Sequence, residues 1–156
     1  MQRLVQEYVA EHRSYRDIEG RVLEIGSYDV NGTLNEELEG CEHIKMDMRE
    51  GPNVDVVANA HVLPFPDDSF DAVICVEMLE HDAAFWVTMK EIERVCRVGG
   101  AVILCASSIG FGLHDHPCDY WRFTAEGMRE LLSFCNQVEA HTDRREVFAS
   151  GVKSDA

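Results

Sequence analysis

The stretch RVLEIGSYDVNG, from Arg21 to Gly32, joins a short apolar run to a glycine turn. The run RVLEI has the composition of a strand that is buried on both faces, which is typical of parallel sheets. In such sheets the first turn after a strand lies at the ligand-binding edge. A dinucleotide site would need the pattern G-x-G-x-x-G, but Tyr28 and Val30 follow Gly26 where further glycines would stand. The stretch therefore predicts a cofactor site that does not press its backbone against a pyrophosphate.

Further short apolar runs indicate the rest of the sheet. They lie at residues 43–47, 54–58, 71–76 and 101–106. Beyond them, segments 136–143 and 145–153 flank a charged turn and predict a closing hairpin. Strands that alternate with helical segments favour an α/β fold, a Rossmann-like sandwich of three layers around a mostly parallel sheet.

Helical spacing of apolar residues indicates three helices. We expect them within 1–18, 82–100 and 124–135. Asp82 is the expected N-cap of the middle helix, and Gly99-Gly100 is its expected stop. The apolar stripe of that helix comprises Phe85, Trp86, Met89, Ile92 and Cys96.

The composition limits the class of protein and its partners. The 156 residues fit one domain, and the formal net charge of −15 disfavours nucleic-acid backbones and anionic membranes. No stretch is long and apolar enough for a membrane span, and the charged start differs from a signal peptide. The six cysteines have no C-x-x-C spacing, which favours reduced thiols over disulfides. We therefore expect a cytoplasmic protein that binds neither nucleic acid nor membrane.

An acidic residue stands at the end of each of the first two predicted strands. Glu24 ends the first strand and would lie beneath a cationic group, with Gly26 beside it to allow close approach of backbone. Asp47 ends the second strand, where a carboxylate can accept hydrogen bonds from both hydroxyls of a ribose. Alternatively, Glu24 caps a turn and Asp47 is solvated. Together, the two acids favour a nucleoside that carries an amino acid.

The order of several motifs resembles one family. VLEIGS, MDM, NAHVLPFPDDSFDAVICVEMLEH and RVCRVGGAVILCA are similar to segments of class I S-adenosylmethionine-dependent methyltransferases, in a branch of small methyltransferase domains. The resemblance covers about residues 20–110 and implies a seven-stranded sheet whose last strand is antiparallel. The chain would be a single domain, 1–156, in which residues 1–18 form a helix, 20–110 bind the cofactor, and 111–156 supply the acceptor loop, a helix and the hairpin.

The resemblance also implies S-adenosylmethionine as cofactor and assigns residues to it. Glu24, Gly26 and Ser27 would line its methionine part, Asp47 would hold the ribose, Met48 would pack on the adenine, Asn59 and Ala60 would lie by the adenine amine, and Val76 and Glu77 would border the methionine and the acceptor. The ring of Tyr28 offers a face to the sulfonium. The family's further loop glycines are absent here, and Asn59 stands where the family often has an acid.

The acceptor side is expected in two loops. Methyl transfer from a sulfonium mainly requires alignment and exclusion of water, so a base is optional. His81, after the fourth strand, could serve as that base, or it could only bond to backbone. In HDHPCDYWRF, which matches a pattern of the same branch, His114 and Tyr120 are further candidates. Asp119 and Arg122 are expected to pair and fix this loop.

The run His114, His116 and Cys118 offers donor types that suit zinc. Side chains at this spacing share a face only in extended chain, and no fourth ligand is evident. The sequence therefore predicts no metal.

These features predict methyl transfer to a small-molecule or sugar-like acceptor. The alternative is a non-catalytic module that binds S-adenosylmethionine or another protein. A nucleotide-dependent oxidoreductase is disfavoured by the glycine pattern. Since no added lid is evident, a second subunit could close the acceptor face, and a homodimer is expected.

Overall fold

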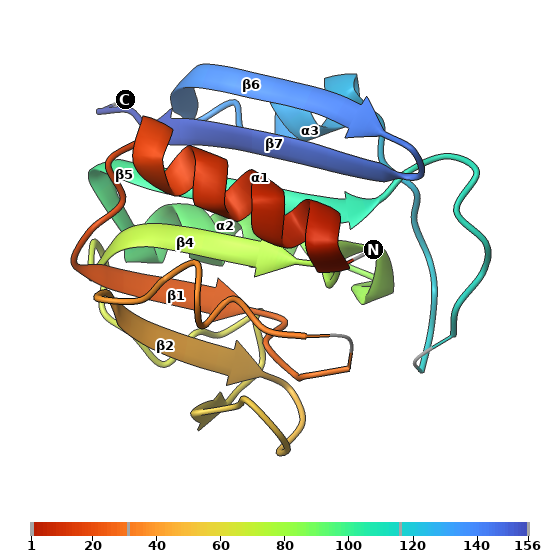
Figure 1. The fold of residues 1–156 in the computed structure, drawn as a ribbon, viewed down its shortest axis with the longest axis horizontal. Coiled ribbons are helices and arrows are strands. Elements are labelled where there is room, and N and C mark those ends of the chain that lie inside the picture. The colour runs from red at the N-terminus through yellow and green to blue at the C-terminus, as the bar shows by residue number, and fades with distance from the viewer. Residues whose placement is uncertain (1, 31, 116, 156) are drawn as a thin grey trace.

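The computed structural model describes residues 2–30, 32–115 and 117–155. Its centre is one seven-stranded sheet in the order β3-β2-β1-β4-β5-β7-β6 (Figure 1). The strands are β1 (Arg21–Ile25), β2 (Glu42–Asp47), β3 (Val56–Val57), β4 (Phe70–Val76), β5 (Cys96–Ser107), β6 (Cys135–Asp143) and β7 (Glu146–Lys153).

The strand directions match the predicted fold. The pairs β3–β2, β2–β1, β1–β4 and β4–β5 are parallel, whereas β7 is antiparallel to both β5 and β6. The Rossmann-like α/β class and the antiparallel last strand are thus confirmed. Strand order reverses between β1 and β4, so the carboxyl ends of these strands form the expected ligand-binding edge.

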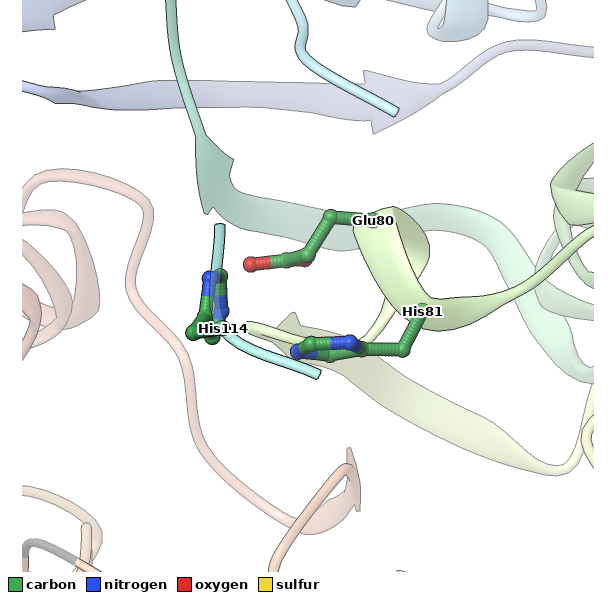
Figure 2. Close-up of side chains that lie close together, drawn as sticks. All are labelled: Glu80, His81 and His114. Atoms are coloured by element: carbon green, nitrogen blue, oxygen red, sulfur yellow. The ribbon is translucent and has the colours of Figure 1, made fainter. Parts of the chain in front are cut away.

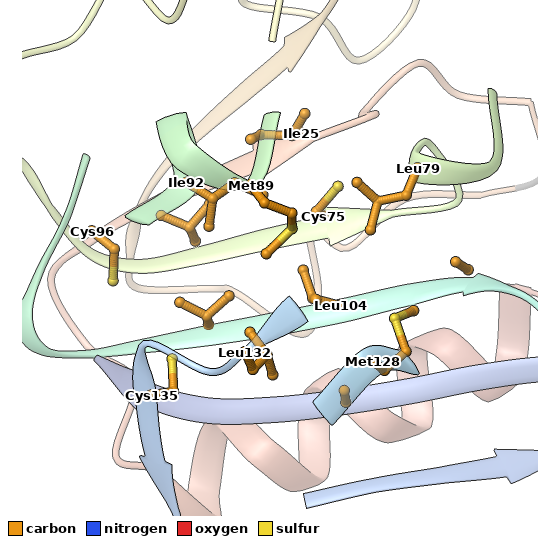
Figure 3. Packing of buried hydrophobic residues seen from close by; sticks show 14 of the residues in the cluster. Ile25, Cys75, Leu79, Met89, Ile92, Cys96, Leu104, Met128, Leu132 and Cys135 are labelled. Atoms are coloured by element: carbon orange, nitrogen blue, oxygen red, sulfur yellow. The ribbon is translucent and has the colours of Figure 1, made fainter. Parts of the chain in front are cut away.

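Helices cover both faces of the sheet. The helix α1 (Gln2–Tyr15) lies on one face, and α2 (Phe85–Val95) and α3 (Ala125–Leu131) lie on the other (Figure 1). Thr124 caps α3 by accepting a hydrogen bond from the Gly127 amide. On the α2 face, Met89 and Met128 pack with strand residues such as Leu104 (Figure 3). Each face has its own hydrophobic core, and the three predicted layers are present.

The boundaries of the middle helix differ from the prediction. Its N-cap is Ala84, while the Asp82 carboxylate accepts from the Ala84 amide and the Thr88 hydroxyl. Cys96 begins β5, and Gly99-Gly100 lies within this strand instead of stopping the helix. Trp86, expected on the buried stripe, is 51% exposed. A strand therefore follows α2 directly, without a glycine turn.

Two other segments are less regular than expected. The predicted strand at 54–58 is reduced to the two residues of β3. Within 32–41, turns bring Leu34 and Leu38 into the core beneath α1. In the described part of the chain, no helix is long and apolar enough to cross a membrane.

Candidate active site

The turn after β1 lies against the end of β4. Gly26 has φ +88°, and a Cβ on it would come within 2.5 Å of the Val76 carbonyl oxygen. Its amide donates to the Met46 carbonyl at 3.0 Å, which ties the turn to β2. Only glycine fits this approach without strain. The turn and the ends of β2 and β4 are therefore contiguous.

Asp47 at the end of β2 organises the neighbouring loop. Its Oδ1 accepts from the Arg49 amide at 2.9 Å, and its Oδ2 accepts from the Tyr28 amide at 3.4 Å. The Tyr28 ring lies 4.6 Å from the Arg49 guanidinium and against Gly51, so it packs within this loop. A carboxylate has about four acceptor sites, and two therefore remain for a ligand.

Glu24 is buried in β1 beside a residue that the sequence analysis did not single out. Its Oε2 lies 2.7 Å from His43 Nε2, and both side chains are nearly inaccessible. A buried carboxylate needs such a partner. The pairing of β1 with β2 could have indicated this contact, because it sets His43 opposite Val22, two residues before Glu24.

The other predicted cofactor residues lie around this edge. Ser27 is buried, and its hydroxyl makes no hydrogen bond within the described residues. Met48 is 67% exposed. Asn59 Oδ1 accepts from the His61 amide at 2.8 Å, and Ala60 is half-buried next to it. Val76 is buried at the end of β4.

Glu77 follows β4 in an unusual backbone conformation. Its φ is +45°, and its Oε1 is buried without a partner in the described parts of the chain. Burial, and then the charge of Glu80, raise the pKa of the Glu77 carboxyl. Strained backbone that carries a desolvated acid is common at functional sites.

The short helix η1 (Leu79–His81) presents a carboxylate that the sequence analysis missed. Glu80 is fully buried, and its Oε1 accepts from the Ser107 hydroxyl at 2.8 Å and from the Ser107 amide at 3.2 Å. Its Oε2 has no partner among the described residues. Glutamate side chains are normally solvated, so the sequence alone gives no sign that this one is buried. Its burial becomes evident only where the folded chain places η1 against Ser107 of β5.

His81 and His114 meet over this carboxylate, as Figure 2 shows. Their ring centroids are 4.7 Å apart in an edge-to-face arrangement. His81 Nδ1 lies 2.5 Å from the Cys118 carbonyl oxygen, and His114 Nδ1 lies 3.3 Å from Asp119 Oδ2. Ligand atoms of Glu80, His81 and His114 all lie within 4.8 Å of one another. The two predicted histidines are thus brought together.

The loop that the sequence predicts to face the acceptor is held by the predicted pairing. Arg122 Nη2 donates to Asp119 Oδ2 at 2.7 Å, and the Asp119 side chain is inaccessible. This guanidinium lowers the pKa of Asp119 well below its usual range. The Tyr120 amide donates to the Glu80 carbonyl at 2.8 Å, whereas the Tyr120 side chain is 51% exposed. The loop is therefore fastened over η1.

Comparison with known proteins identifies this architecture. A family model described as "Methyltransferase domain" matches residues 35–104. A ubiquinone/menaquinone biosynthesis C-methyltransferase of Hahella chejuensis is 34% identical over 77 residues, which are 49% of this chain and 30% of that protein. Residues 35–104 of the chain are thus similar to a methyltransferase domain, and the match spans less than a third of the curated relative. Both matches agree with the methyltransferase family that the motifs resemble.

Solved structures of methyltransferases share the fold of the domain. A SAM-dependent methyltransferase of Archaeoglobus fulgidus has a TM-score of 0.75 at 15% identity, over 98% of this chain and 95% of that one. A Burkholderia thailandensis 1,6-didemethyltoxoflavin-N1-methyltransferase, solved with S-adenosylhomocysteine, has a TM-score of 0.72 at 15% identity, over 96% of this chain and 78% of that one.

A further acid at this edge of the sheet was not expected from the sequence. Glu146, the first residue of β7, is 3% exposed, and its Oε2 is buried without a partner in the described chain. Burial, and then the charge of Glu77, raise the pKa of this carboxyl to about 7. It also lines a cavity of about 210 Å³ with Phe111 and Arg144. Glu77 and Glu146 therefore act on each other electrostatically across the carboxyl ends of the strands.

Two cavities of the structure do not coincide with the predicted cofactor site. A larger cavity of about 400 Å³ lies at the opposite edge, near Gly20 and Asp71. Neither of these two cavities is lined by the predicted cofactor residues. His116 lies outside the described residues, so the expectation that His114, His116 and Cys118 together bind no metal stays a prediction.

Proposed function

We propose that the methyltransferase domain transfers a methyl group from S-adenosylmethionine to a hydroxyl of a small-molecule or sugar-like acceptor. The observation that carries this proposal is the contact between Gly26 and the Val76 carbonyl. It supports the proposal because the turn after β1, where the cofactor would bind, lies against the end of the strand that leads to His81. Cofactor and acceptor groups would thus share one edge of the sheet.

The residues at this edge fit the cofactor. The missing side chain of Gly26 leaves room for close approach, and the unpaired hydroxyl of buried Ser27 offers a bond to a polar ligand group. Asp47 would accept from the ribose hydroxyls with its remaining lone pairs, and exposed Met48 would cover the adenine with Asn59 and Ala60 beside it. Glu24, already bonded to His43, would act beneath the methionine part through its charge.

The acceptor side would align a hydroxyl and remove its proton. When bound, S-adenosylmethionine supplies an activated methyl group on a sulfonium. Val76 and Glu77 would border this group, and the buried Glu77 carboxylate favours a nearby cation. His81 or His114 would take the hydroxyl proton, and Tyr120 would contact the acceptor from the exposed side of the loop.

The net charge and the free thiols bear on the partners and the cellular compartment of the protein. We infer that nucleic acid and membranes are not its partners, because the net charge is −15. All six cysteines are free, as a reducing compartment such as the cytoplasm would keep them. A single domain and a homodimer that closes the acceptor face stay predictions.

A binding and transfer experiment tests the proposal. Titration calorimetry should show binding of S-adenosylmethionine and of S-adenosylhomocysteine, with no binding of NAD. The protein should also move label from methyl-labelled cofactor to a component of a small-molecule extract. His114→Ala should slow this transfer by about 10²–10⁴-fold and leave cofactor affinity unchanged. Binding without transfer to any extract would favour the non-catalytic module.

A further inference from the structure

We infer that Glu80, His81 and His114 form a binding site for a divalent transition-metal ion. The three side chains come from η1 and from the acceptor loop and turn toward one another (Figure 2). Their ligand atoms lie within 4.8 Å of one another. This set differs from the run of His114, His116 and Cys118, because only His114 belongs to both.

The hydrogen bonds of the two imidazoles prepare them for a metal. His81 Nδ1 donates to the Cys118 carbonyl, and His114 Nδ1 faces Asp119 and the Gly112 carbonyl. These bonds fix the tautomer in which Nε2 carries the lone pair. Nε2 of neither ring makes a hydrogen bond within the described residues. Metal-binding histidines characteristically donate their second ring nitrogen to a carbonyl or carboxylate in this way.

Glu80 supplies an independent indication of a ligand. It is fully buried, and Ser107 occupies only one of its oxygens. The other oxygen, Oε2, has no partner in the described chain, and the carboxylate points toward His114 (Figure 2). A buried carboxylate oxygen without a partner is costly, and a bound cation would compensate it.

The donor set selects the class of ion. Two imidazole nitrogens and carboxylate oxygens suit Zn²⁺, Co²⁺, Mn²⁺ or Fe²⁺ better than Ca²⁺ or Mg²⁺, which prefer oxygen alone. Zinc bonds of about 2.1 Å place tetrahedral ligands about 3.4 Å apart. The present separations therefore need a modest closure, which rotation of the His114 side chain on its loop can provide.

The charge around the cluster also favours a cation. Glu77 and Glu146 each have a buried oxygen without a partner among the described residues. No Lys or Arg side chain forms an ion pair with Glu77, Glu80 or Glu146 within the described chain. Divalent charge at the histidines would offset these three carboxylates together.

The metal would act on the acceptor. This step rests on the proposed function, whereas metal binding itself does not. A position of the ion that the protein leaves open would take the acceptor hydroxyl and lower its pKa, as metal ions do for bound water. With Nε2 of both histidines bound to the ion, the hydroxyl proton would pass to solvent; the oxygen anion would form a bond to the methyl carbon as the carbon–sulfur bond of the sulfonium breaks and S-adenosylhomocysteine leaves.

Metal titration tests the site without any cofactor. Tag-free protein, stripped with a chelator, is titrated with Zn²⁺ by calorimetry and with Co²⁺ by visible absorbance. We expect one ion per chain and Co²⁺ bands of a site with nitrogen and oxygen ligands. His114→Ala and Glu80→Gln should each weaken binding by 100-fold or more. Glu80→Gln keeps an oxygen for Ser107 and replaces only the unpaired one.

Controls separate this inference from the proposed function. His141→Ala, on exposed β6, should bind the ion as the unchanged protein does. Far-ultraviolet circular dichroism of each variant verifies folding, and His114→Ala decides if Glu80→Gln does not fold. Affinities within threefold of the unchanged protein in His114→Ala would overturn the metal site. Full transfer activity after chelation would overturn the metal's role in transfer. Loss of cofactor binding alone would contradict only the proposed function.

Discussion

The two halves of the ligand-binding edge differ in how their polar groups are satisfied. At the ends of β1 and β2, Asp47 accepts two backbone amides and Glu24 pairs with His43. At the ends of β4 and β5, Glu77 and Glu80 each keep a buried oxygen without a partner in the described chain. The carboxylates of the first half, which we propose as the cofactor half, are thus internally bonded, while the second, the proposed acceptor half, has buried carboxylate oxygens that a further group would satisfy.

This difference predicts that variants in the two halves will respond to different conditions. Changes in the cofactor half should act through geometry and through a few bonds to the ligand. Changes in the acceptor half should depend on pH and on cations. Each variant below acts on one side of this contrast.

The largest effect is expected from Gly26→Ala. The new methyl group would overlap the Val76 carbonyl at 2.5 Å, in a backbone conformation with φ +88°. We expect unfolding free energy to fall by about 2–4 kcal/mol and cofactor binding to become undetectable by calorimetry. Gly110→Ala is the matched control, since φ is +91° there but nothing lies within 4 Å. It should cost only about 1–2 kcal/mol and retain the cofactor. Equal losses in both variants would refute the close approach.

A smaller effect is expected from Asp47→Asn. The amide keeps an oxygen for the Arg49 amide but lacks the charge that strengthens bonds to ribose hydroxyls. Affinity for S-adenosylhomocysteine should fall by about 2–3 kcal/mol, or roughly 30- to 150-fold, in calorimetry. Asp55→Asn, at an exposed carboxylate beside Lys45, should leave this affinity unchanged. If Asp47→Asn binds as tightly as the control, the ribose assignment is wrong.

The sequence was a good guide where local patterns decide the structure. Apolar runs located the long strands, and Thr124 marked the start of α3 as a cap should. The end of α2 was misplaced because glycines were interpreted as a stop, while Gly100 instead lies tightly packed inside β5 against the Cys96 sulfur. Only tertiary packing decides between these two roles of glycine.

The candidate site was less predictable for the same reason. His81 and His114 were identified by type, but their contact depends on a loop folding back over η1. Glu80 was missed, because the residue that pairs with its buried carboxylate, Ser107, is 27 residues away in the sequence. Interactions of such long range leave no local pattern in one sequence.

Asp119→Asn should affect the acceptor half alone. Loss of the pairing with Arg122 leaves a guanidinium less well satisfied and should lower unfolding free energy by about 1–3 kcal/mol in urea denaturation. Acceptor affinity should fall while cofactor affinity stays constant. Arg122 lowers the pKa of Asp119 from 3.8, so this stabilisation is present above that pH and is lost as pH falls further. The difference between the two proteins should therefore shrink in acid.

An exposed pair serves as the control for this loop. Arg3 and Glu7 are 88% and 56% exposed, and Arg3→Gln should cost less than about 0.5 kcal/mol. A similarly small effect of Asp119→Asn would show that the loop does not depend on its ion pair.

The smallest effect, and the most dependent on pH, is expected from Glu146→Gln. Burial raises the pKa of Glu146 from 4.5 to about 7, so the folded state favours the protonated carboxyl. The resulting stabilisation is complete below pH 4.5 and is lost as pH rises through about 7. Gln resembles the protonated form at every pH. In the presence of chelator, the Tm of the variant should equal that of the unchanged protein at pH 4 and exceed it by roughly 3–6 °C at pH 8. Glu126→Gln, at an 86% exposed carboxylate, should show no such trend. A pH-independent difference for Glu146→Gln would mean that this carboxylate is solvated, and the acceptor half would then lack part of its unbalanced charge.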